Sequence, residues 1–100
     1  MRLLLFISMV VFAGCKSTTS FDVNKELRYC ITQADKTNKS LQDSSLIPRS
    51  IANGKTDWRK VNYHDWTCGF YPGILWYNYE YSKDEKWKKE ATRFSKALFH

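Results

Sequence analysis

Aromatic and acidic side chains are concentrated in one part of this 100-residue chain. Residues 57–81 hold nine aromatic residues, and they also contain three carboxylates, Asp57, Asp65 and Glu80. Most glycosidases use two positioned carboxyl groups, and an aromatic ring offers a flat apolar face on which a sugar ring can stack. These residue types together indicate a site that binds or cleaves a sugar.

Asp65 and Trp66 are the candidates in this segment that could act together. Trp66 stands just before a predicted helix, in a loop from which a rigid scaffold can present its indole face and N–H group to a sugar. The alternative is a core tryptophan that packs the loop, and we favour that role for Trp58, Trp76 and Trp87. For Asp65 we favour a carboxylate that caps the turn before the helix by accepting hydrogen bonds from loop amides.

The sequence gives little support for a metal site, a disulfide or a bound cofactor. His64 has no second ligand at a characteristic metal-binding spacing, so we expect a hydrogen-bonded loop histidine and no metal site. Cys30 and Cys68 could form a disulfide in an oxidising compartment, but two separate buried thiols are the favoured interpretation. There is no phosphate-binding glycine loop, and we expect no cofactor.

Two helices are predicted on either side of a long loop. Residues 21–42 carry apolar side chains at three- and four-residue spacing, with Ser20 or Asp22 as the cap. Residues 48–67 lack a helical period and are expected to form a long ordered loop, because Pro48 ends the helical pattern before it. Residues 70–81 form a helix that is apolar nearly all round, which other elements must enclose.

Residues 83–99 are predicted to form a third, amphipathic helix. Ser82 with Glu85 matches a capping box, and Asp84 is the alternative cap. Its polar face is basic, and the cations that line it are Lys86, Lys89, Arg93 and Lys96. The whole chain has a net charge of +6, but acids are interleaved on this helix, so we expect a solvated face and no nucleic-acid partner.

The first 15 residues have the layout of a secretory leader. Arg2 precedes an apolar run, and small residues then precede Cys15. Residues 12–15, FAGC, resemble a bacterial lipoprotein lipobox, although Phe12 stands where leucine is usual. The resemblance implies a signal peptide over 1–15, a lipidated Cys15 and a tether over 16–20. Since no acidic run follows the cysteine, we expect a membrane-anchored protein of the bacterial cell envelope that faces the periplasm.

The aromatic segment resembles the first motif of glycoside hydrolase family 88, the unsaturated glucuronyl hydrolases. Residues 65–76 read DWTCGFYPGILW, and YEY at 79–81 and Asp84 follow. The family motif reads D-W-T-x-G-F-(aromatic)-x-G-x-L-W, then Y-E-Y and an acidic turn. The similarity extends over residues 46–98, including the stretch around Pro48.

This resemblance implies an all-α fold, with residues 21–100 as the first helices of an (α/α)₆ barrel that continues beyond the chain. It implies hydration of the C4=C5 bond of a terminal unsaturated uronic acid in lyase-produced, glycosaminoglycan-type oligosaccharides, followed by cleavage of the glycosidic bond. Family members use an aspartic acid as the proton donor and no metal or cofactor. Trp66 matches the tryptophan that lines the uronic-acid pocket, whereas the catalytic aspartates would lie beyond residue 100.

The predicted function is therefore that of the N-terminal part of an unsaturated glucuronyl hydrolase. Since no residue of the chain matches a catalytic aspartate, we expect the 100 residues alone to be inactive. The alternative is a non-catalytic carbohydrate-binding lipoprotein of the envelope that uses the aromatic cluster as a platform.

Overall fold

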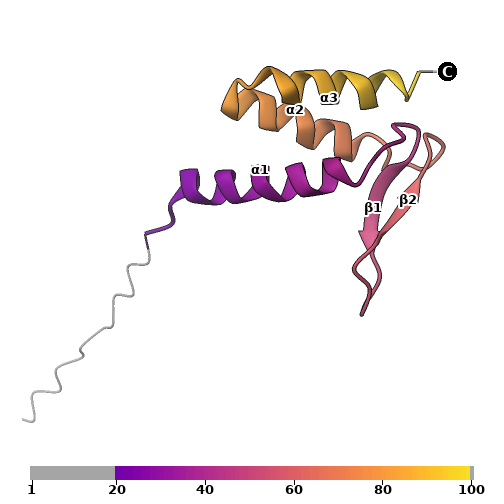
Figure 1. The fold of residues 1–100 in the computed structure, drawn as a ribbon, viewed down its shortest axis with the longest axis horizontal. Helices are drawn as coiled ribbons and strands as arrows, with labels where there is room; N and C mark the ends of the chain where they lie inside the picture. The colour runs from indigo at the N-terminus through magenta and orange to yellow at the C-terminus, as the bar shows by residue number, and fades with distance from the viewer. Residues whose placement is uncertain (1–19, 100) are drawn as a thin grey trace, which may run out of the picture.

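The computed structural model describes residues 20–99, which form three helices and a two-stranded hairpin (Figure 1). In chain order the elements are α1 (Val23–Lys39), β1 (Ile47–Ile51), β2 (Trp58–Val61), α2 (Phe70–Ser82) and α3 (Glu85–Lys96). The predicted, mostly helical character is confirmed, although the all-α prediction omits this small hairpin, and the (α/α)₆ barrel stays a prediction. The predicted leader, the lipidated Cys15 and nearly all of the 16–20 tether lie outside the described residues.

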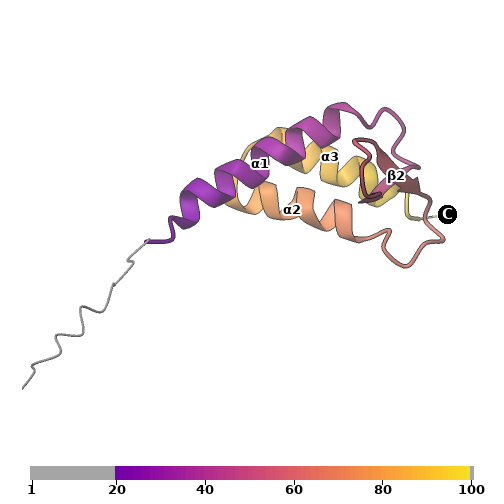
Figure 2. The same ribbon diagram turned by 90° about the horizontal axis from the view of Figure 1, so that it is seen from below.

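The three helices lie side by side, and the hairpin sits at one end of them (Figures 1 and 2). α2 and α3 pack along their length as an antiparallel pair, and α1 packs against α2. The hairpin lies where α1 ends and α2 begins, so the loop that precedes α2 is next to β1 and β2. None of the helices within residues 20–99 has the length and apolar character needed to cross a membrane.

Local capping explains where α1 and α3 begin. Asp22 accepts a hydrogen bond from the Lys25 amide at 3.1 Å, as the sequence suggested. At α3 the cap is Asp84, whose carboxylate accepts from the Lys86 amide at 3.0 Å. The Ser82 hydroxyl instead accepts from the Asp84 amide at 3.2 Å, so Asp84 is the cap and Ser82 supports it.

The hairpin replaces most of the long loop predicted over residues 48–67, and residues 62–67 after it form turns. β1 and β2 are antiparallel, with Ile47 opposite Val61 and Ile51 opposite Trp58. Gly54 has a φ of 72° at the hairpin tip, a left-handed conformation that glycine adopts without steric cost. Pro48 is tolerated because an edge strand does not need every amide for pairing.

A small core holds the elements together. Its buried side chains come from all three helices, from the connection between α1 and β1, and from β1 itself, and they are Ala34, Leu41, Ile47, Tyr71, Leu75, Trp87, Ala91 and Phe94. The Tyr71 and Phe94 rings meet edge to face, with centroids 5.0 Å apart. The core position predicted for Trp87 is confirmed, whereas Trp76 is exposed and Trp58 is half-buried.

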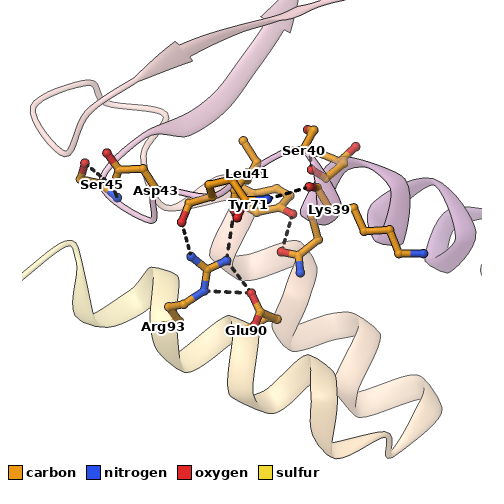
Figure 3. Close-up of polar contacts among 11 residues, drawn as sticks. Lys39, Ser40, Leu41, Asp43, Ser45, Tyr71, Glu90 and Arg93 are labelled. Carbon is orange, nitrogen blue, oxygen red and sulfur yellow. Dashed lines mark hydrogen bonds and ion pairs between the residues drawn. The ribbon is translucent and has the colours of Figure 1, made fainter.

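Polar contacts join α3 to the chain that leaves α1 (Figure 3). The Arg93 guanidinium donates to the carbonyl oxygens of Leu41 and Gln42 at 3.4 and 3.5 Å. It also pairs with Glu90 of the same helix at 2.6 Å. The Tyr71 hydroxyl donates to Asn38 Oδ1 at 3.1 Å, so α1, α2 and α3 are all joined at this end of the bundle.

The apolar helix α2 is covered on one side only. Tyr71 and Leu75 are buried against the other helices. The opposite stripe is exposed among the described residues, and its members are Phe70, Ile74, Tyr77 and Tyr81. These four residues recur at three- and four-residue spacing, so they form one continuous face along the helix.

Candidate functional site

A cavity of about 780 Å³ lies between α1, the hairpin and the start of α2. A volume of this size lies within the range of small-molecule sites. Its walls are mostly apolar, and the residues that contribute to them include Tyr29, Thr37, Arg49, Trp58, Arg59, Trp66, Phe70 and Ile74. Three segments that are distant in the sequence therefore meet around one space.

Trp66 stands at the edge of this cavity with most of its side chain exposed. Its exposed fraction is 75%, so in the described chain it does not pack into the core. Its ring meets that of Phe70 edge to face, with centroids 5.6 Å apart. The indole face is thus available to a ligand, and sugar binding by Trp66 stays a prediction.

Asp65 organises the turn that carries Trp66, as predicted. Its Oδ1 atom accepts from the Thr67 amide at 2.9 Å and from the Thr67 hydroxyl at 2.7 Å. These hydrogen bonds, and then the positive charge of Arg49, hold the pKa of Asp65 below its ordinary value of 3.8. A carboxyl group with a lowered pKa is ionised at neutral pH, so Asp65 is not suited to donate a proton.

Arg49 is a residue of this site that sequence reasoning did not single out. Its Nη1 atom lies 3.1 Å from Asp65 Oδ2, and both side chains are largely shielded, with 28% and 18% exposed. The strand register passes from the pair Pro48 and Lys60 to the pair Ser50 and Arg59, so Arg49 occupies a bulge. The sequence indicates only weakly that Arg49 belongs to the site, because a bulge depends on how two strands pair.

The other carboxylates of the aromatic segment are not brought to the cavity. Asp57 is exposed before β2, and Glu80 pairs with Lys83 at 2.9 Å near the end of α2. Within residues 20–99, no aspartate or glutamate lines the cavity. The described chain therefore supplies an aromatic and cationic wall and no pair of acids.

His64 and the two cysteines have ordinary surroundings. The His64 amide donates to Asn62 Oδ1 at 3.1 Å, and its ring lies 4.1 Å from that of Tyr63. In the part of the chain that the structure describes, no group of three potential metal ligands is present. Cys30 and Cys68 are free thiols, as predicted, but Cys30 is exposed and Cys68 half-buried, so their predicted burial is wrong.

Two of the four cations on the basic face of α3, Lys86 and Arg93, lie in ion pairs. Lys86 lies 3.0 Å from Asp35 of α1, and Lys88 lies 3.5 Å from Glu85. Arg93 is held by Glu90, as described above. These pairs offset part of the positive charge that the sequence places on this helix.

A comparison with known proteins relates part of the chain to a glycoside hydrolase. Over 43 residues the chain is 40% identical to the unsaturated glucuronyl hydrolase of Bacillus sp. (strain GL1). This stretch is 43% of the chain and 11% of the relative. No family model and no solved structure matches the chain.

Proposed function

We propose that the chain forms the substrate-binding front of an unsaturated glucuronyl hydrolase. The observation that carries this proposal is the placement of Trp66, which is exposed at the edge of an apolar cavity and stands on a turn fixed by Asp65. The partial similarity to a hydrolase of that name supports it. In this proposal the indole face stacks on the terminal unsaturated uronic acid of an oligosaccharide.

The proposed reaction adds water across the C4=C5 bond of that sugar, and the hydrated sugar then rearranges and leaves. The step needs a carboxyl group that is protonated near neutral pH. Asp65 does not meet this need, because its pKa is lowered, and no carboxylate within residues 20–99 lines the cavity. We therefore assign the proton donor to a segment that lies outside these 100 residues.

The remaining parts of the proposal concern the rest of the molecule. The part of the exposed α2 stripe that does not line the cavity, which contains Tyr77 and Tyr81, would pack against further helices of an (α/α)₆ barrel. Lipidation at Cys15 would hold the protein to a membrane of the cell envelope, on the periplasmic side.

The proposal is tested by measuring how tightly the 100-residue chain binds an unsaturated uronic-acid disaccharide, with isothermal titration calorimetry. Trp66→Ala should weaken binding by about tenfold or more, because one stacked aromatic side chain is removed. Tyr77→Ala is the matched control, because Tyr77 is 78% exposed but does not line the cavity. The affinity of the Tyr77→Ala variant for the disaccharide should equal that of the parent chain. Equal affinities for the parent chain and the Trp66 variant would contradict the proposal.

A turnover assay distinguishes the proposed hydrolase from the alternative, a non-catalytic carbohydrate-binding lipoprotein. Hydration removes the C4=C5 bond, so the ultraviolet absorbance of the disaccharide falls. The 100-residue chain should leave the absorbance unchanged, whereas a longer product of the same gene that supplies the acid should reduce it. Binding without turnover by every product of the gene would favour the carbohydrate-binding lipoprotein instead.

A further inference from the structure

We infer that Arg49 is a positioning residue for Trp66, and that it acts through Asp65. This inference rests on the proposed function, because it concerns how the sugar-stacking side chain is held in place. It gives the β-hairpin a second role beside lining the cavity, because Arg49 of β1 would hold the turn that carries Trp66.

The bulge in β1 gives Arg49 its direction. Pro48 faces Lys60 and Ser50 faces Arg59, so Arg49 has no partner of its own across the ladder. A bulged residue departs from the regular alternation of a strand, and bulges recur where a side chain has to be re-aimed. The Arg49 guanidinium thus reaches the turn before α2 instead of following the face of the sheet.

The two oxygens of Asp65 divide their contacts between the turn and the hairpin. Oδ1 is used by the Thr67 amide and hydroxyl, and Oδ2 by Arg49 at 3.1 Å. The Asp65 carbonyl also accepts from the Cys68 amide at 3.0 Å. Trp66 lies between Asp65 and Thr67 in sequence, so its backbone is closed into a turn that Arg49 ties to β1.

The exposure of Trp66 makes this tie important. A buried tryptophan is held by its packing, but the Trp66 side chain is 75% exposed and meets the edge of the Phe70 ring. The position of its indole therefore depends on the backbone turn. A charge-assisted contact between two partly buried side chains resists displacement more than an exposed ion pair does.

Amide hydrogen exchange tests the first half of the inference without any ligand. In Arg49→Gln the Thr67 and Cys68 amides should exchange about tenfold faster, because the turn has lost its tie to the hairpin. Lys60→Gln is the matched control, since Lys60 lies beside the bulge on β2 and does not line the cavity. Unchanged exchange in Arg49→Gln would overturn the inference.

A double-mutant cycle on disaccharide affinity tests the second half. Arg49→Gln should weaken binding about 5- to 20-fold, Arg49→Lys less, and Arg49→Gln in a Trp66→Ala background by less than about twofold. Arg49 also borders the cavity, so a direct contact with an anionic sugar is the rival explanation. In that case the two substitutions would act independently, and this additive result would overturn the inference.

Asp65→Asn provides a second approach if Arg49→Gln does not fold. It removes the negative partner of Arg49 but keeps an oxygen for Thr67, so it should reproduce the loss of affinity. Binding that depends on Trp66 but not on Arg49 or Asp65 would overturn this inference alone. No binding by the parent chain would overturn the proposed function together with it.

Discussion

At the residue scale, the candidate site contains Trp66, which a sequence motif predicts, and Arg49, which reaches the site only because two strands pair. Trp66 could be singled out because its place in a D-W-T sequence before a helix is local. The turn-capping role of Asp65 was predictable for the same reason, since its hydrogen-bond partner Thr67 is two residues away. Arg49 was not predictable, because its contact with Asp65 requires a particular strand register and a bulge.

The ionisation of Asp65 gives a prediction at this scale. Its pKa is lowered in the folded chain, so its contribution to stability is fully present above the ordinary value of 3.8 and is lost as the pH falls through the native pKa. The Thr67 amide signal in an NMR titration should therefore have a midpoint below pH 3.8. Arg49→Gln should move this midpoint upward, and Lys60→Gln should leave it nearly unchanged. A midpoint at or above 3.8 in the parent chain would contradict the contacts described for Asp65.

At the element scale, the helices were predictable and the hairpin was not. Apolar spacing and caps such as Asp22 and Asp84 are local signals, and they place α1, α2 and α3 within a few residues of their observed ends. β1 and β2 are only five and four residues long, and they carry proline, arginine and lysine. Their pairing comes from contacts across a turn and from burial of Ile47, which a local pattern does not record.

The turn between α2 and α3 gives a prediction at this scale. Lys83 has a φ of 55°, and its amide donates to the Tyr79 carbonyl at 2.7 Å, so it ends α2 in the left-handed conformation. Lys83→Gly should raise the free energy of unfolding by about 0.5–1 kcal/mol, because glycine adopts this conformation without steric cost.

Lys83→Ala is the control for that substitution. It removes the exposed ion pair with Glu80 in the same way but keeps the Cβ atom, so it should be neutral or slightly destabilising. Urea unfolding of both variants measures the difference. If glycine and alanine give equal stabilities, the backbone of Lys83 is not strained.

At the scale of the whole molecule, the described chain buries one side of α2 and leaves the other open. Leu75 is fully buried, whereas Phe70 and Tyr77 are 61% and 78% exposed. A helix that is apolar on both sides is suited to a position between two layers of other elements. The described residues supply one of those layers, and the proposed barrel would supply the other.

This arrangement predicts how residues 16–100 behave alone. Circular dichroism should show helix, because the caps and the core around Trp87 and Phe94 are present. The thermal transition should be broad, because a small chain with an open apolar face buries little surface on folding. A dye that binds exposed apolar surface should bind the chain, and Tyr77→Lys should reduce that binding while the helical signal stays the same. A sharp transition without dye binding would show instead that these residues form a complete cooperative unit, and the proposed role of the α2 stripe in a larger barrel would then be wrong.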